Sequence, residues 1–370
     1  MKKIVYLSAS TIPSKAANSV HVMKMCQAFA KHGYEVTLLA WNGGGTVEDA
    51  FEKYGVEPCF ELVRFERLNI PGAILHLSLK MYKWVKENKK VDIIYGRNLY
   101  ALMATAKLNK KFVLEVHSPL NSHIQSLIQR YLFSTDNFSF LVTISNALKK
   151  EYLKEYTQLK PQKVIVAHDG ADFNETVVQS NLDNFKINIG YIGHMYPGRG
   201  LEVILELSKR FDDCIFHLVG GMDKDIDYWK KIFKGQKNVI FYGFIEHSKT
   251  EILRNSFDIL LAPYQKKVAV HGGKVDTSKW MSPLKIFEYM SSGKPIICSN
   301  LPVLQEVLIH EKNALLCDPE NTDEWVEALH KLICNEDLRS ALGTEAQKIL
   351  IEKYTWFKRA EDILNKIYLK

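Results

Sequence analysis

Short runs of apolar residues alternate with longer stretches of helical periodicity along the whole chain. The runs have the length of buried strands, and strands of a parallel sheet covered on both faces read as nearly continuous apolar segments. The alternation therefore predicts an α/β protein with parallel sheets and helical crossovers. The expected strands are at residues 3–7, 35–40, 92–95, 112–116, 140–144, 164–167, 187–192, 215–219, 239–242, 259–262, 296–298 and 314–317.

One polar stretch, residues 172–186, interrupts this alternation and has no strong period. Stretches of this kind commonly connect domains. A chain of 370 residues is also too long for one ordinary hydrophobic core. We therefore expect two domains of the same architecture, an N-terminal domain at 1–175 and a C-terminal domain that begins at 186.

The composition is that of a globular protein, with 46% apolar and 25% charged residues. Six cysteines are scattered without paired spacing, which favours reduced thiols over disulfides or a zinc site. No apolar run approaches the roughly 20 residues of a membrane-spanning helix, and the start of the chain does not have the pattern of a signal peptide. We expect a cytoplasmic protein, and the net charge of +7 is too small to indicate a nucleic-acid partner.

Residues 281–297 carry the clearest chemical pattern, a loop followed by a short helix and a strand. Ser282 is expected to cap this helix and Pro283 to be its first residue, which leaves backbone N–H groups free to bind a diphosphate. Lys285 would face the phosphates, and Glu288, one turn later, would accept hydrogen bonds from two ribose hydroxyls. The alternative is an ordinary amphipathic helix with a solvated Glu288.

This segment resembles the donor-binding motif of glycosyltransferase family 4, whose members are retaining enzymes of the GT-B fold. Two glutamates frame the nucleotide sugar in that motif, and Glu288 matches the second, which holds the ribose. The first position is Trp280 here, so a neighbour such as Asp276 would have to act on the sugar ring. The resemblance implies two Rossmann-like domains that face each other across a cleft. The donor would bind to 186–353, and a C-terminal helix in 354–370 would cross back to the first domain.

The loop after the strand at 187–192 strengthens the resemblance. In the family this loop supplies two cations that grip the donor diphosphate, and their positions hold His194 and Arg199 here. An arginine binds phosphate in a bidentate fork, whereas a histidine near neutral pH can be uncharged. Lys285 could supply the missing charge, with Lys274 or Lys279 as alternatives.

The first expected loop, residues 8–19, lacks the Gly-x-Gly-x-x-Gly pattern of dinucleotide-binding domains, which argues against an oxidoreductase. The family usually has a glycine pair there, and Asn18 could adopt the left-handed conformation that a glycine would. Altogether, the resemblance implies donor contacts at Asn18, Gly193, His194, Arg199, Gly220, Gly221, Ser282, Pro283, Leu284, Lys285 and Glu288.

His117 stands at the carboxyl end of the strand expected at 112–116, where open α/β sheets bind ligands. It resembles the histidine that contacts the transferred sugar in the family, although a histidine in such a place can be purely structural. The implied catalytic residues are therefore His117, Arg199, Lys285 and Glu288.

These features predict a retaining hexosyltransferase that uses a UDP- or GDP-linked sugar. Its acceptor would be a hydroxyl of a glycan or of a lipid-linked saccharide, in the synthesis of a bacterial surface polysaccharide or glycoconjugate. No metal and no cofactor besides the donor is expected, since a helix start, Arg199 and Lys285 would meet the diphosphate. Two alternatives stay open, a sugar-nucleotide epimerase of the same fold and a non-catalytic membrane-surface protein on a decayed transferase fold.

Two helical segments, 74–90 and 149–160, combine lysines with apolar and aromatic residues. Such segments can bind an anionic membrane surface, although helices of this kind more often pack on their own sheet as ordinary surface helices. We therefore expect a cytoplasmic protein that can lie peripherally on the inner face of the cytoplasmic membrane.

Overall fold

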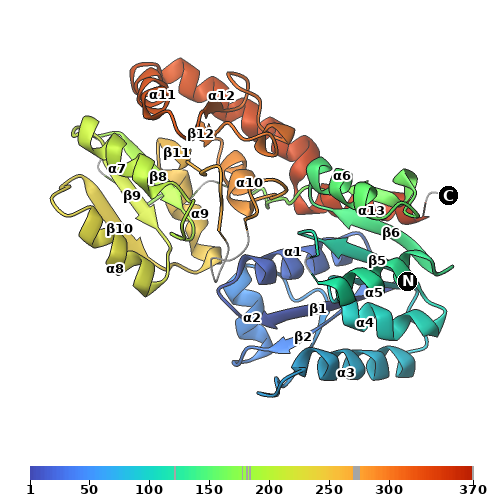
Figure 1. Cartoon of the computed structure of the whole chain (residues 1–370). Coiled ribbons are helices and arrows are strands. Elements are labelled where there is room, and N and C mark those ends of the chain that lie inside the picture. Colours follow the sequence, from blue (N-terminus) through green and yellow to red (C-terminus); the bar gives the residue numbers. More distant parts are fainter. Residues whose placement is uncertain (121, 177, 181, 183–184, 270–275, 369–370) are drawn as a thin grey trace. The chain divides into compact units, whose positions relative to one another are not determined.

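A computed structural model of the chain describes residues 1–120, 122–176, 178–180, 182, 185–269 and 276–368. The contacts within it divide the chain into two units. Unit 1 comprises Met1–His168 and the C-terminal segment from Trp356, and unit 2 comprises Asp169–Thr355. Each unit contains one parallel sheet with helices packed against it (Figure 1), which confirms the expected α/β architecture.

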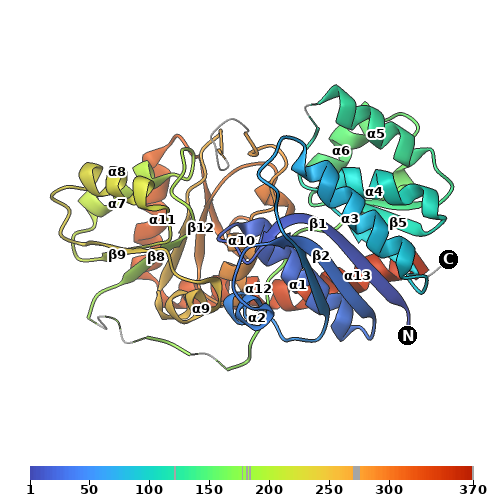
Figure 2. The ribbon, with the colours of Figure 1, turned by 90° about the horizontal axis from the view of Figure 1, so that it is seen from below.

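The sheet of unit 1 has the strand order β3-β2-β1-β4-β5-β6-β7, and every neighbouring pair is parallel. Its strands are β1 (Lys3–Ile12), β2 (Glu35–Asn42), β3 (Glu61–Phe65), β4 (Ile93–Gly96), β5 (Lys111–Val116), β6 (Phe138–Thr143) and β7 (Val164–Val166). Its α-helices are α1 (Ala17–Lys31), α2 (Val47–Tyr54), α3 (Ala73–Glu87), α4 (Leu99–Thr105), α5 (His123–Phe133), α6 (Asn146–Glu155) and α13 (Trp356–Tyr368). Helix α1 contacts α2 and α13, while α3, α4 and α5 form a separate row (Figure 2).

Two parts of this sheet differ from the expectation. Strand β1 continues past residue 7 to Ile12, because the chain resumes pairing with β2 after an irregularity between Leu7 and Thr11. Strand β3 was not expected, since it is a short edge strand in which Leu62 is the one buried residue and no apolar run marks it.

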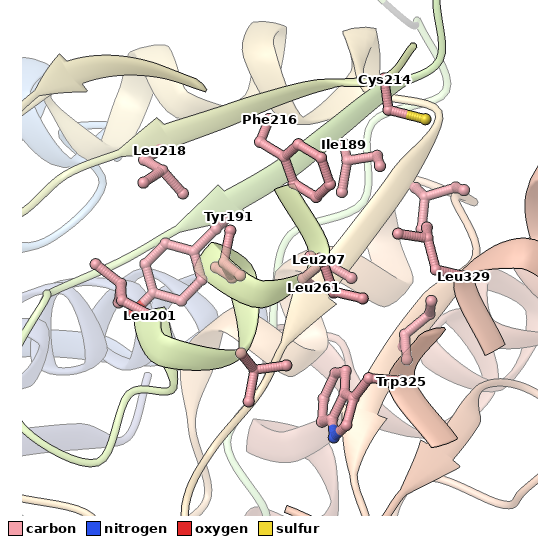
Figure 3. Packing of buried hydrophobic residues seen from close by; sticks show 14 of the residues in the cluster. Ile189, Tyr191, Leu201, Leu207, Cys214, Phe216, Leu218, Leu261, Trp325 and Leu329 are labelled. Atoms are coloured by element: carbon pink, nitrogen blue, oxygen red, sulfur yellow. The ribbon is translucent and has the colours of Figure 1, made fainter. Parts of the chain in front are cut away.

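The sheet of unit 2 has the order β10-β9-β8-β11-β12-β13 and is also parallel throughout. Its strands are β8 (Asn188–Ile192), β9 (Ile215–Val219), β10 (Val239–Gly243), β11 (Ile259–Ala262), β12 (Ile296–Ser299) and β13 (Leu315–Cys317). Its α-helices are α7 (Leu201–Arg210), α8 (Asp223–Ile232), α9 (His247–Ser256), α10 (Leu284–Ser291), α11 (Thr322–Cys334) and α12 (Glu336–Ile349). Phe216, Leu261 and Trp325 lie in the apolar core between the sheet and its helices (Figure 3).

The described part of the polar stretch 172–186 is attached to unit 2. The Asn174 side chain donates to the Glu251 carboxylate at 2.9 Å, and the Ser180 N–H donates to the Ser256 hydroxyl at 2.7 Å. Both acceptors belong to α9, so side-chain hydrogen bonds hold this stretch where apolar packing does not.

Helix α13 returns to unit 1, as expected, and is anchored there by a buried ion pair. Arg359 Nη2 lies 3.1 Å from Glu115 Oε1, and the two side chains are 2% and 0% exposed. The same guanidinium donates to the carbonyl oxygens of His168 at 2.8 Å and Ala167 at 3.2 Å. One side chain therefore joins the C-terminal helix to the ends of β5 and β7.

Replacing Arg359 with methionine should lower the free energy of unfolding by about 3 kcal/mol at neutral pH, because it leaves the buried Glu115 without its charge partner. Urea denaturation measures this change. Arg130→Met is the matched control, since Arg130 and Glu155 form an exposed pair at 3.1 Å whose loss should cost at most about 1 kcal/mol. Equal effects of the two substitutions would show that the Arg359–Glu115 pair does not anchor α13.

Candidate active site

The strand order of unit 2 reverses between β8 and β11, which is where open α/β sheets bind ligands. Gly193 follows β8 with a φ of +151°, and a Cβ there would lie 2.9 Å from Lys285 Nζ. A Cβ on Gly220, which follows β9, would lie 2.4 Å from the Gly193 carbonyl oxygen. The two glycines therefore allow the loops to touch each other and Lys285. Gly221, with a φ of +85°, continues the second loop in the left-handed region.

Two cations, Arg199 and Lys285, lie beside these loops and share an aromatic support. Lys285 Nζ is 3.7 Å from the ring centre of Tyr191 and 5.3 Å from that of Tyr264. The Arg199 guanidinium carbon is 5.4 Å from the same Tyr264 ring, and its Nη2 donates to the carbonyl oxygen of Ala269 at 3.2 Å. Within the described part of the chain, neither cation is paired with a carboxylate, and Arg199 Nε has no hydrogen-bond partner.

Burial, followed by the nearby charge of Arg199, holds the pKa of the Lys285 ammonium well below its usual range. Aromatic faces stabilise cations without neutralising them. The Arg199–Lys285 pair therefore forms a positively charged site that an anion such as a diphosphate can occupy.

Helix α10 carries the predicted donor motif, but it begins one residue later than predicted. Leu284 is its first residue, and Pro283 is at the N-cap with the extended angles φ −76° and ψ 125°. The Ser282 hydroxyl does not cap the helix, because it accepts a hydrogen bond from the backbone N–H of Asp169 at 2.8 Å. Since no side chain caps α10, its first N–H groups remain available to a ligand.

Glu288 lies one turn along α10 and contacts a residue that the sequence did not single out. His247 Nε2 is 2.7 Å from Glu288 Oε1, with side-chain exposures of 29% and 14%. His247 is the first residue of α9, forty-one positions away in the sequence. No local signal could have predicted this contact, because it exists only once α9 and α10 are packed on the sheet.

His194, the expected first cation, stacks on Tyr196 with ring centres 4.8 Å apart and an angle of 9° between the planes. Its carbonyl oxygen accepts a hydrogen bond from the Tyr191 hydroxyl, which holds the loop against the ring that also supports Lys285. The structure thus places His194 in the same loop as Arg199, with its ring stacked on Tyr196.

Asp276, a candidate for the missing first glutamate, is used within its own loop. Its Oδ1 accepts hydrogen bonds from the N–H groups of Val268 at 2.9 Å and Ser278 at 3.0 Å. Among the alternative cations, Lys279 is exposed and Lys274 is outside the described residues.

In unit 1, His117 is half-buried at the end of β5 and belongs to a network centred on Glu115. Glu115 Oε1 lies 2.6 Å from His117 Nε2 and 2.7 Å from His21 Nε2, while the Tyr95 hydroxyl donates to Oε2. Burial by itself raises the pKa of Glu115, but the charges of Arg359 and His21 and the imidazole hydrogen bonds reverse this effect and hold it well below the usual range. The sequence singled out His117 alone in this network.

Burial, with the charge of Arg97 as the next cause, lowers the pKa of His117 to about 4. His117 is therefore neutral near pH 7. Its Nε2 is engaged with Glu115, so Nδ1 is the ring nitrogen left to contact a substrate.

His21, Glu115 and His117 are also the described residues whose ligand atoms lie close enough together, within 4.8 Å, to hold a metal ion. The distances between these side chains fit hydrogen bonds better than the coordination of a metal ion. The contacts of 2.6 and 2.7 Å are hydrogen-bond distances, and Arg359 places a positive charge 3.1 Å from the same carboxylate oxygen.

Asn18 is the second residue of α1 and is exposed. The idea that it replaces a glycine by adopting a left-handed conformation is wrong, because Asn109 and Glu311 are the non-glycine residues with positive φ in the described ranges. Asn18 has helical geometry, since α1 begins at Ala17, inside the stretch 8–19 that was expected to be a loop.

Comparison with known families decides the assignment. The family described as "Glycosyltransferase Family 4" matches residues 19–175, and the one described as "Glycosyl transferases group 1" matches residues 172–349. The chain belongs to glycosyltransferase family 4. As a member of this family it is a glycosyltransferase that uses nucleotide-sugar donors.

Individual relatives agree with the family assignment. An uncharacterized glycosyltransferase of Haemophilus influenzae is 23% identical over 366 residues, which is 96% of each chain. The O-antigen chain mannosyltransferase RfbU of Salmonella typhimurium is 22% identical over 214 residues, or 57% of this glycosyltransferase and 56% of RfbU. The crystal structure of Anabaena Alr3699/HepE in complex with UDP superimposes with a TM-score of 0.74 at 15% identity over the whole of both chains, which shows that the two share the GT-B fold.

Binding of a nucleoside diphosphate such as UDP or GDP should weaken as the pH rises, at pH values below the ordinary lysine range. The reason is that only the ammonium form of Lys285 attracts phosphate, and its pKa in the free protein is lowered. Bound phosphate favours the ammonium form, so each binding event takes up protons in this window. Titration calorimetry at a series of pH values, above the range in which the nucleotide phosphates ionise, measures the effect.

Lys285→Arg is the control for this titration, because an arginine stays charged and should make the affinity independent of pH over the same range. A parent affinity that stays constant up to the ordinary lysine range near pH 10.4 would place Lys285 outside the phosphate site.

Proposed function

We propose that this family 4 enzyme is a retaining hexosyltransferase that takes its sugar from a UDP- or GDP-linked donor. The observation that carries the proposal is the Arg199–Lys285 pair, two cations with no carboxylate partner among the described residues. They lie beside the glycine loop at Gly193 and the helix that begins at Leu284. Anabaena Alr3699/HepE, which shares the fold, binds UDP and UDP-glucose.

In this proposal the donor diphosphate lies against Arg199, Lys285 and the first N–H groups of α10. Its negative charge grows as the bond between sugar and phosphate breaks, so fixed positive groups stabilise the transition state more than the bound donor. Glu288 accepts hydrogen bonds from the ribose hydroxyls, and His247 keeps its carboxylate in place. His117 accepts a hydrogen bond from the transferred sugar through Nδ1, and the departing phosphate takes the proton of the acceptor hydroxyl.

The acceptor in this proposal is a hydroxyl of a glycan or lipid-linked saccharide, as part of surface polysaccharide or glycoconjugate synthesis. The similarity to RfbU, an O-antigen chain mannosyltransferase, supports this choice. An epimerase would need carboxylates free to move protons at the sugar. Glu288 and Asp276, the two carboxylates that the donor motif singles out, are engaged with His247 and with backbone N–H groups instead.

A screen of donor hydrolysis across UDP- and GDP-linked hexoses should identify a donor, and NMR of the released sugar should show that the anomeric configuration is retained at first. Arg199→Ala and Lys285→Ala should each lower kcat about tenfold to a hundredfold with a smaller change in KM, because their charges act mainly in the transition state. Arg210→Ala is the control, since Arg210 forms an exposed pair with Asp323.

An effect of these two substitutions on KM alone would limit both cations to donor binding. A released sugar with inverted anomeric configuration would contradict the retaining mechanism. If the protein hydrolysed none of the donors, the proposal of hexosyl transfer would be contradicted.

We also propose that unit 1 binds an anionic membrane surface through the row formed by α3, α4 and α5. In α3, Leu75 and Leu79 are 51% and 63% exposed, and their helical spacing places them on the same side as the exposed Lys83 and Lys86. Helix α5 adds Ile124, Leu127 and Tyr131, which recur at helical spacing and are 66%, 52% and 44% exposed. Exposed apolar side chains beside lysines are typical of helices that lie in the membrane interface.

The second expected membrane segment, 149–160, does not have this character. Tyr152 and Tyr156 are buried against unit 1, so its aromatic side faces the protein. No described helix combines the length and the apolar composition needed to cross a bilayer. The proposed contact therefore rests on α3 and α5 and is peripheral.

The unmodified protein should sediment with anionic liposomes at low salt and less so as the salt concentration rises, since each lysine near such a surface contributes about 1 kcal/mol that salt screens. Replacing Lys80, Lys83 and Lys86 with glutamate should abolish sedimentation and leave donor hydrolysis intact. The same change at Lys230, Lys231 and Lys234, exposed residues in or beside α8 of unit 2, is the matched control. Failure of the unmodified protein to bind would make a soluble acceptor the better hypothesis.

A further inference from the structure

Arg97 occupies the place in unit 1 where its sheet, like that of unit 2, is expected to bind a ligand. It directly follows β4, and the strand order of unit 1 reverses between β1 and β4. Its backbone N–H donates to the carbonyl oxygen of Leu7 at 3.0 Å, and the next residue, Asn98, caps α4 by accepting from the Ala101 N–H at 3.2 Å. The backbone is therefore fixed on both sides of Arg97.

The side chain of Arg97 is half-buried and lacks a counter-charge. Its Nη1 is shielded from solvent and has no hydrogen-bond partner, and no carboxylate within the described ranges pairs with the guanidinium. The Tyr6 hydroxyl on the neighbouring β1 is likewise buried without a partner. Burial raises the pKa of the Tyr6 hydroxyl well above its usual range and lowers that of His117, and the positive charge of Arg97 opposes the first shift and adds to the second, so Arg97 lies near both groups.

The Glu115 carboxylate contacts His117 in this group of residues, and it already has several other partners. Its Oε1 contacts His21, His117 and Arg359, and its Oε2 accepts from the Tyr95 hydroxyl. A carboxylate with these donors has no free position for a further arginine. Among the residues that the structure describes, the positive charge of Arg97 therefore has no carboxylate partner.

A buried arginine nitrogen without a hydrogen-bond partner lowers the stability of the folded protein. The planar guanidinium group matches the geometry of phosphate and carboxylate groups. We propose that Arg97 binds an anionic group of a substrate, a phosphate or a carboxylate, beside His117. The inference rests on the proposed function, because it assigns this site to a reacting molecule. Two sources have the required chemistry, the diphosphate of the donor and an acidic group on the acceptor.

The test is an NMR titration of the Arg97 side-chain Nε–H signal with inorganic phosphate, compared with chloride at equal ionic strength to remove the effect of screening. Arg97→Gln identifies the signal by its loss. The titration is carried out in the Arg199→Ala variant, so that phosphate does not bind at the site proposed in unit 2. Arg130 on α5 is the control arginine, and Arg130→Gln identifies its signal. We expect the Arg97 signal to shift and saturate with phosphate and not with chloride.

The titration is then repeated with saturating UDP, in protein that retains Arg199. If UDP alone moves the Arg97 signal and prevents the response to phosphate, the anion is the donor diphosphate. If phosphate still moves the signal in the UDP-bound protein, the anion belongs to the acceptor. Either result supports the inference, whereas an equal response to phosphate and chloride, or no response, overturns it.

This experiment is independent of turnover. A protein that hydrolyses no nucleotide sugar would contradict the proposed function, while the phosphate titration of unmodified protein would still decide whether Arg97 is an anion site. If Arg97→Gln does not fold, Arg97→Lys identifies the signal instead, and the unmodified protein supplies the result.

Discussion

A parallel sheet brings the carboxyl ends of all its strands to one edge, and this constraint governs every functional feature of the glycosyltransferase. In unit 2 it places the loops after β8 and β9 together, so that Gly193 and Gly220 come within contact distance of each other. In unit 1 it places Arg97, which follows β4, beside Leu7 of β1. The strand order reverses at both places, where the crossover helices turn to opposite faces and leave room for a ligand.

Each of the two units contains cations that do not pair with a described carboxylate. In unit 1 the buried carboxylate of Glu115 is paired with Arg359 and also contacts His21 and His117, and no described carboxylate pairs with Arg97. In unit 2 Arg199 and Lys285 rest on tyrosine rings, which orient a cation without cancelling its charge. Positive charges that pair with no described carboxylate suit an enzyme whose donor carries phosphates.

The departures from the family pattern have physical consequences. His194 stands where a permanent cation is usual, and it stacks on Tyr196, so the charge at this loop depends more heavily on Arg199 and Lys285. Trp280 stands in place of the first glutamate of the donor motif, and the neighbouring Asp276 holds its own loop together. A long arginine fork and a half-buried lysine can still meet a diphosphate, because phosphate binding depends on charge and donor geometry rather than on one residue type.

The sequence alone determined the features that arise from short-range patterns. Apolar runs and their helical spacers predicted the parallel α/β architecture, and the motif around Lys285 and Glu288 predicted the family. The same reasoning missed β3, because an edge strand with one buried residue has no apolar run, and it placed the cap of α10 on Ser282, whose hydroxyl binds Asp169 instead.

Only the tertiary structure decided which distant residues share a site. His247 meets Glu288 across 41 positions, and Arg359 meets Glu115 across 244, so neither pair leaves a periodic or local signal in the chain. The same holds for the tyrosines that support Lys285 and for Arg97 Nη1, which has no hydrogen-bond partner among the described residues. Periodicity reports which side of an element is buried, whereas the partner of a buried charge depends on how the elements pack, and that is decided by the whole fold.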